Sequence, residues 1–152
     1  MVLTQKEATL IEDLKSSEKL CIEKYSKYAA EAKDAQLKSL FTEIANAETK
    51  HLSMLDSITD GTVPTVPQGG GPSDTQTFNA TYKIGETPEK KCDSYFCTDL
   101  LSMEKHVSGV YDTCVFEFAN QGIRDVLNHI QKEEQEHGKK LYDYMSTNAM
   151  YS

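Results

Sequence analysis

The sequence predicts an all-α fold, an antiparallel four-helix bundle built from two helical hairpins and a long crossover. Three observations predict it. Four long segments are rich in good helix formers and contain no proline. A stretch rich in proline and glycine separates the first two segments from the last two. The two halves also repeat each other at one constant offset, which indicates a bundle with internal pseudo-symmetry.

The first hairpin consists of predicted helices over Lys6–Ala32 and Asp34–Ile58. Thr4 is a suitable N-cap, and Glu7 three residues later completes a capping box. The helices meet at the short joint 33–36, so we expect them to lie antiparallel.

The segment 59–91 is a loop by composition, with Pro64, Pro67, Pro72 and three successive glycines. We expect a short extended piece at Tyr82, Lys83 and Ile84. Extended, such a segment reaches on the order of 100 Å, whereas a helix of 25 residues is about 38 Å long. The crossover can therefore run the length of the bundle and set the third helix parallel to the second. This one-crossover connectivity is the ferritin-like arrangement.

The second hairpin consists of predicted helices over 93–119 and 123–145, separated by a break at Asn120-Gln121-Gly122. An offset of 86 residues places the first half on the second, for example Glu18 on Glu104, Tyr25 on Tyr111 and His51 on His137. We expect one domain over residues 1–152, with a hairpin at 4–58, a crossover at 59–91 and a hairpin at 92–146.

Each predicted helix carries an apolar stripe at helical spacing, and a glutamate interrupts every stripe at mid-length. In the second and fourth helices the interruption is Glu-x-x-His. Burying an ionised carboxylate costs several kcal/mol unless it is compensated, and no lysine or arginine lies on these stripes. Two divalent ions would balance four carboxylates. The candidate metal ligands are Glu18, Glu48, His51, Glu104, Glu134 and His137.

Oxygen-rich ligands with two imidazoles suit two Fe or Mn ions, and imidazole also accepts zinc. Tyr25 and Tyr111 lie two turns beyond a stripe glutamate, where their hydroxyls could hydrogen-bond the carboxylates or simply pack in the core. A bundle that keeps its core glutamates without metal is the alternative interpretation.

Other candidates have weaker patterns. Glu133 neighbours Glu134 but breaks the spacing to His137, and His106 and His129 are expected on the surface. None of the four cysteines forms a Cys-x-x-Cys pair, so we expect reduced, mostly buried thiols rather than a zinc ribbon. They are Cys21, Cys92, Cys97 and Cys114.

The bulk composition excludes some function classes. The net charge is −8, and the basic residues are scattered among acids, which disfavours nucleic acid as a partner. No apolar run approaches the roughly 20 residues of a membrane span. The N-terminal MVLTQKEATL is too polar for a secretory signal, so we expect synthesis in the cytoplasm and no signal peptide.

Both hairpins resemble the coat F family of spore coat proteins, through LTQKEATLIEDLKSSEKLCIEKYSKYAAEAKDAQLKSLF and EKHVSGVYDTCVFEFANQGIRDVLNHIQKEEQEHGKKLYDYM. This resemblance implies a ferritin-like fold, a place in the spore coat laid down during sporulation, and other coat proteins or further copies of the chain as partners, as in a homo-oligomer.

The ligand pattern resembles that of bacterioferritin and rubrerythrin. It implies one metal at Glu18, Glu48 and His51 and another at the matching residues of the second half, with bridging glutamates. The iron–sulfur domain of rubrerythrin is missing, and its extra third-helix carboxylate is Val107 here. We also expect no fifth helix of the kind found in storage ferritins, which disfavours iron storage in a cage.

Three functions therefore stand as hypotheses. The first is a coat component with a bound dinuclear metal centre. The second is a di-iron or di-manganese oxidoreductase that consumes peroxide or oxygen. The third is a metal-free structural helical module.

Overall fold

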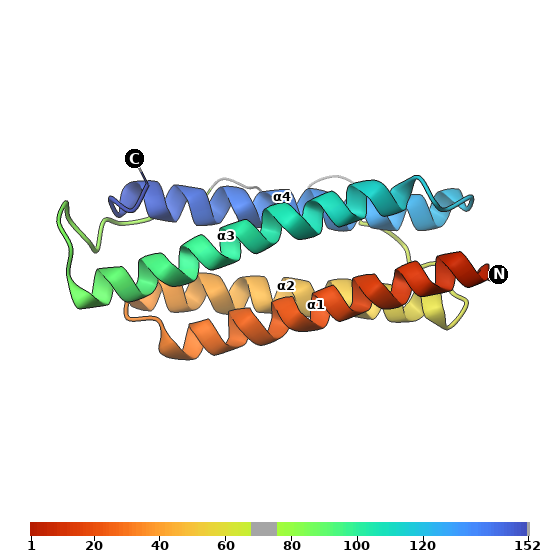
Figure 1. The fold of residues 1–152 in the computed structure, drawn as a ribbon, viewed down its shortest axis with the longest axis horizontal. Helices are drawn as coiled ribbons and strands as arrows, with labels where there is room; N and C mark the ends of the chain where they lie inside the picture. The colour runs from red at the N-terminus through yellow and green to blue at the C-terminus, as the bar shows by residue number, and fades with distance from the viewer. Residues whose placement is uncertain (68–75, 152) are drawn as a thin grey trace.

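The computed structural model describes residues 1–67 and 76–151 and contains four long helices (Figure 1). They are α1 (Gln5–Glu31), α2 (Ala35–Thr59), α3 (Pro88–Val115) and α4 (Gln121–Thr147). The described residues form no strand. α1 packs along α2 and α3 along α4, and the two hairpins meet through α1 against α3 and α2 against α4. The prediction of an all-α four-helix bundle is confirmed.

The connectivity is also the predicted one. α1 and α2 run in opposite directions, the crossover returns to the end where α2 began, and α3 then runs parallel to α2 (Figure 1). α4 runs back beside α3. The three glycines and Pro72, which we predicted to lie in a loop, fall outside the described residues.

Local side-chain chemistry explains where the helices begin. The capping box of Thr4 and Glu7 is present, as predicted. Asp34 caps α2 by accepting from the Gln36 N–H, and Asn120 caps α4 by accepting from the Ile123 N–H. Each cap satisfies a backbone donor that the first helical turn leaves free.

Three predicted boundaries are wrong. The third helix begins at Pro88 and not near 93, because Thr87 caps it and proline is well placed in a first turn. It ends at Val115 and not at 119. The break predicted at 120–122 instead opens α4, whose N-cap is Asn120. The extended piece expected at Tyr82–Ile84 contains bends and no strand.

The predicted stripes form the core. On α1 the predicted stripe is Leu14, Glu18, Cys21, Tyr25 and Tyr28, of which only Tyr28 is half-buried. The predicted stripes of α2 and α4 are buried throughout: Leu37, Phe41, Ile44, Glu48, His51, Leu55 and Ile58 on α2, and Ile123, Leu127, Ile130, Glu134, His137 and Leu141 on α4. The four polar interruptions lie at the same level along the bundle, since each falls near the middle of its helix. The apolar side chains above and below them fix the helices around this level.

A second set of buried polar groups closes the end of the bundle that holds the α1–α2 joint. Asp93 is fully buried and accepts hydrogen bonds from the backbone N–H groups of Lys33 (2.8 Å) and Asp34 (2.9 Å) and from the Tyr82 hydroxyl (2.6 Å). Asp34 accepts from the Tyr144 hydroxyl at 2.7 Å. These contacts tie the α1–α2 joint and the crossover to α3 and α4. Within the described part of the chain, no helix has the length and apolar character needed to cross a bilayer.

Candidate metal centre

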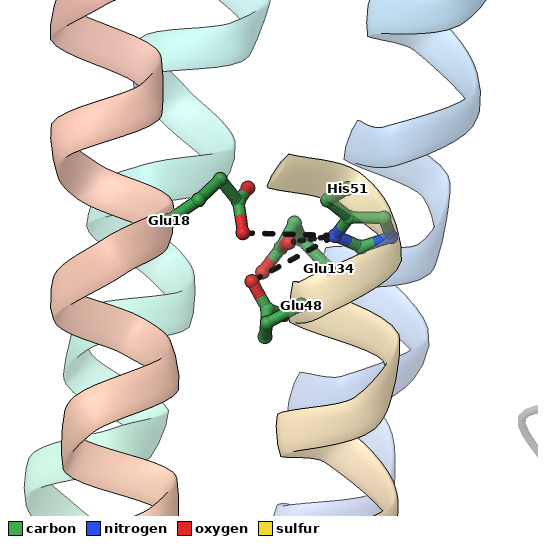
Figure 2. Close-up of side chains that lie close together, drawn as sticks. All are labelled: Glu18, Glu48, His51 and Glu134. Carbon is green, nitrogen blue, oxygen red and sulfur yellow. Dashed lines mark hydrogen bonds and ion pairs between the residues drawn. The ribbon is translucent and has the colours of Figure 1, made fainter. Parts of the chain in front are cut away.

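The six residues singled out by the stripes come together in the middle of the bundle, and we call them the carboxylate–histidine cluster. Figure 2 shows Glu18 from α1, Glu48 and His51 from α2 and Glu134 from α4 pointing toward one another. Glu104 of α3 and His137 of α4 complete the set. Five of the six are at most 2% exposed and His137 is 5% exposed. These side chains are therefore removed from bulk water.

The cluster divides into two overlapping groups of four. Within each group, one possible ligand atom per residue lies within 4.8 Å of those of the other three. The first group is Glu18, Glu48, His51 and Glu134, and the second is Glu48, Glu104, Glu134 and His137. Glu48 and Glu134 belong to both. Spacing along the chain left open which glutamates are shared, and the fold places these two between the groups.

The contacts of the histidines cross between the hairpins. His51 Nδ1 lies 3.0 Å from Glu134 Oε1 and farther, at 3.7 and 3.8 Å, from Glu48 and Glu18 (Figure 2). His137 Nδ1 lies 2.9 Å from Glu48 Oε1, although without the alignment that a hydrogen bond requires. Each histidine thus approaches the glutamate of the other hairpin's Glu-x-x-His motif.

The two tyrosines cross between the hairpins in the same way. The Tyr25 hydroxyl donates to Glu104 Oε1 and the Tyr111 hydroxyl to Glu18 Oε1, both at 2.6 Å. Both rings are fully buried. Burial first, and then the neighbouring carboxylate, raises the pKa of each phenol well above its ordinary value, so both remain hydrogen-bond donors. The tyrosines therefore orient the two carboxylates that the groups do not share.

The protonation of the metal-free cluster is strongly perturbed. Burial, followed by the contact with Glu48, raises the pKa of Glu18 to about 8. Burial and then the nearby Glu104 raise the pKa of Glu134 well above its ordinary value. Burial lowers the histidine pKa values, but contacts with the surrounding carboxylates outweigh it and raise both. The cluster without metal therefore retains protons at neutral pH.

Glu48 shows the opposite balance. Burial raises its pKa, but the contacts with Glu18, His137 and His51 outweigh burial and hold the pKa well below its ordinary value. Its negative charge is thus shared among protonated neighbours. A dication between these groups would replace the protons as the source of positive charge.

Several buried polar atoms of the cluster have no hydrogen-bond partner. They are Oε2 of Glu18, both carboxylate oxygens of Glu48, Oε2 of Glu104, Oε2 of Glu134 and Nδ1 of His137. Buried polar atoms in folded proteins are nearly always satisfied, so each exception requires an explanation. Five carboxylate oxygens and one imidazole nitrogen are a donor set that iron and manganese accept. The residues present therefore fit a dinuclear metal centre.

Glu133 is the one member of the site that sequence reasoning set aside. Its Oε1 lies 2.8 Å from His51 Nε2 and 3.3 Å from His129 Nε2, and the contact with His51 lowers the pKa of Glu133. It fixes the ring of His51 from the side opposite the cluster. The internal repeat gave no reason to select Glu133, because the matching residue of the first half is Ala47. His129 is half-buried, and His106 is exposed as expected.

The cysteines are all free thiols, and Cys92 alone among them is not fully buried. Cys21 lies one turn from Glu18, and its Sγ is 3.8 Å from Met103 Sδ. Burial, and then the carboxylates led by Glu48, raises the pKa of this thiol far above its ordinary value. In the metal-free protein, Cys21 is thus an uncharged core residue.

Two pockets reach the second group from outside. One, of about 480 Å³, lies between α3 and α4, and its lining includes Glu104 and Glu134. The other, of about 250 Å³, lies between α2 and α4 and is lined by His137, Ala47 and Lys140 among others. The second group is therefore the more accessible half of the cluster.

The match to a known protein family lies in the second hairpin. Residues 93–152 match the Coat F domain family. The chain is also similar to the uncharacterized protein YusN of Bacillus subtilis (strain 168), with 32% identity over 66 residues. That match covers 43% of this chain, and the chain spans 60% of the length of YusN. No solved structure matches. From Asp93 to the end of α4, including Glu104, Glu134 and His137, this chain is similar to the Coat F domain.

Proposed function

We propose that the protein is a component of the bacterial spore coat whose four-helix bundle binds a dinuclear centre of iron or manganese. The coat assignment is supported by the similarity of residues 93–152 to the Coat F domain. The metal assignment is supported by the geometry of the carboxylate–histidine cluster. The partners would be other coat proteins or further copies of the chain.

The single observation that carries the metal proposal is the set of buried ligand atoms without hydrogen-bond partners. A bundle that needed only mechanical stability would be more stable with leucine at these positions, because buried carboxylates carry a desolvation cost of several kcal/mol. The chain keeps four carboxylates at 2% exposure or less. Two bound dications would compensate the charge and occupy the free lone pairs together.

The residues would divide as the two overlapping groups do. Glu18 and His51 would hold one ion, Glu104 and His137 the other, and Glu48 and Glu134 would bind both. Bound iron or manganese would supply Lewis acidity and one-electron redox chemistry. Zinc fits the same donors but would supply only the Lewis acidity.

A second candidate function is an oxidoreductase that consumes peroxide or oxygen. The pocket between α3 and α4 favours it, because Glu104 and Glu134 of the cluster are among its lining residues. A coat protein can also be such an enzyme, so the two functions are compatible. A metal-free structural module is the third candidate, and the protonated cluster described above is the form it would take.

Metal content tests the proposal. The wild-type protein, loaded anaerobically with Fe(II) or Mn(II) and desalted, should retain about two ions per chain. The double variant Glu48→Gln/Glu134→Gln should retain almost none, because both shared ligands are lost. A matched control, Glu23→Gln/Glu31→Gln, changes two exposed glutamates of α1 and should bind as the wild type does. Equal retention by the cluster variant and the control would overturn the ligand assignment.

The coat assignment has its own test. Spores of the producing organism are separated into coat and core fractions, and the protein is quantified in each by mass spectrometry. Recovery with the coat fraction supports the proposal, and recovery with the core contradicts it. Peroxide turnover by the metal-loaded protein, absent from the double variant, would establish the second candidate.

A further inference from the structure

The pocket between α3 and α4 has a volume and a lining that suit a small organic ligand. Its volume of about 480 Å³ is in the range of sites for small organic ligands and far exceeds the size of peroxide or oxygen. Leu101, Gly138 and the rings of Tyr142 and Tyr151 contribute apolar surface, and Lys105 and Gln135 also line the pocket. Glu104 and Glu134 are lining residues too, with side chains that are 2% and 0% exposed. We infer that this pocket binds a small phenol, with its ring against the apolar wall and its hydroxyl toward the cluster.

The internal repeat shows that small residues line this pocket where the first half of the chain has large ones. At the offset of 86 residues, Gly138 corresponds to Leu52 and Ser108 to Ile22. Both Gly138 and Ser108 line the pocket, so the second half carries two small residues where the first half carries two large ones. A Cβ added at Gly138 would meet only Leu101 Cδ1, at 3.7 Å. A larger side chain here would thus project into the pocket without displacing the backbone.

Aromatic groups surround one part of the pocket. Tyr142 and Tyr151 are 43% and 44% exposed, and their rings lie edge to face with centroids 5.0 Å apart. The residue matching Tyr142 in the first half is Asp56. Aromatic rings favour offset or edge-to-face contacts with other rings. A ligand with one aromatic ring would therefore gain more from this pocket than an aliphatic one of equal size.

The carboxylates of the cluster favour a ligand that carries a hydroxyl group. The cluster already accepts one phenol hydroxyl at this level, since Tyr25 donates to Glu104 Oε1 at 2.6 Å. Oε2 of Glu104 and Oε2 of Glu134 are buried and have no partner. A phenol has one hydroxyl donor opposite an apolar ring, which matches the distribution of groups in the pocket.

This inference rests on the proposed function in one respect, because the free oxygens of Glu104 and Glu134 are also proposed metal ligands. In the metal-free protein they would accept the phenol hydroxyl, whereas a bound ion would occupy them and would offer the phenol oxygen a ligand position instead. The pocket can therefore be tested in the metal-free protein.

The experiment is a titration of the metal-free full chain with phenol, followed by the NMR signals of the Gly138 amide and the Leu101 methyl groups. We expect saturable shifts in the wild type and at least tenfold weaker binding in Gly138→Leu, whose Leu101 methyl groups remain observable. Ser108→Ile tests the opposite wall with the same expected loss and both signals intact. Gly109→Leu is the matched control, because Gly109 is an exposed helical glycine of α3 outside the pocket lining, and it should bind phenol as the wild type does.

The outcomes separate the two proposals. No saturable shift at these groups, or equal binding by the wild type and both pocket variants, would overturn the phenol site even if two metal ions bind. Phenol binding that is lost in the pocket variants supports the site even if the protein takes up no metal. Circular dichroism of each variant establishes that a loss of binding reflects the pocket and not unfolding.

Discussion

Replacing Glu18 by glutamine should stabilise the metal-free protein and weaken metal binding at the proposed centre. Glutamine keeps the shape of the side chain and a carbonyl oxygen that can accept the Tyr111 hydrogen bond. It removes the carboxyl group whose pKa rises from an ordinary 4.5 to about 8, mainly because of burial and then because of Glu48. Glu23→Gln, an exposed change on the same helix, is the control.

Proton linkage gives the sign and size of the difference in unfolding free energy between the Glu18→Gln variant and the wild type. A carboxyl whose pKa is raised by folding stabilises the folded state fully below its unfolded pKa, and this contribution is lost as the pH rises through its folded pKa. Between pH 4.5 and pH 7 the loss is 1.36 kcal/mol per pH unit, or about 3 kcal/mol in total. The metal-free Glu18→Gln protein should therefore exceed the wild type by about this amount at pH 7 and approach it near pH 4.5.

The assay is urea unfolding of chelator-treated protein at pH 5 and pH 7, followed by circular dichroism. Added Fe(II) or Mn(II) should reverse the order of stability at pH 7, because the wild type gains the binding free energy of both ions and the variant loses a ligand of one. If the metal-free variant is no more stable than the wild type at pH 7, or if the difference does not grow between pH 5 and pH 7, the account of the buried Glu18 charge is wrong.

Three further predictions concern single side chains. Tyr25→Phe removes the donor to Glu104 and should lower the free energy of unfolding by about 1–3 kcal/mol in urea titrations, whereas an unchanged value would show that the carboxylate finds another donor. Asp93→Ala removes the acceptor of three hydrogen bonds, one of them from the backbone N–H of the buried Asp34, and should cost about 3 kcal/mol or more, with faster amide exchange at the α1–α2 joint as the local readout. Burial raises the pKa of Asp99, but hydrogen bonds from Tyr28 and Lys24 outweigh it and lower the pKa overall. This stabilisation is present above the ordinary value of 3.8 and is lost as the pH falls below it, so Asp99→Asn should flatten the acid side of the melting-temperature profile, and a profile parallel to the wild type would contradict this.

The fold and the set of cluster residues could be predicted because both depend on helical periodicity. An apolar stripe every three or four residues determines which side chains face inward, so the glutamates on the stripes had to be buried once four helices packed. The length of the crossover determined the connectivity. The start of α3 was missed although Thr87-Pro88 carries a local signal, because the composition of the preceding loop dominated the interpretation.

Other features depend on how the helices are rotated and paired, which periodicity does not specify. Glu48 and Glu134 are shared by the two groups because α2 and α4 pack antiparallel with these residues facing each other's histidine. Glu133 reaches His51 only across that same interface. Asp93 of α3 joins the distant α1–α2 joint to the crossover. None of these contacts is a repeat within one helix, so the sequence pattern carried no signal for them.

The central claim is that the carboxylate–histidine cluster is a dinuclear metal centre, and elemental analysis of the protein purified from its native source tests it most directly. The account predicts about two iron or manganese ions per chain. Less than about a tenth of an ion per chain, both as purified and after anaerobic loading, would contradict the account, because metals that bind with useful affinity are retained through purification. The buried carboxylates would then be held by shared protons alone, in a structural bundle.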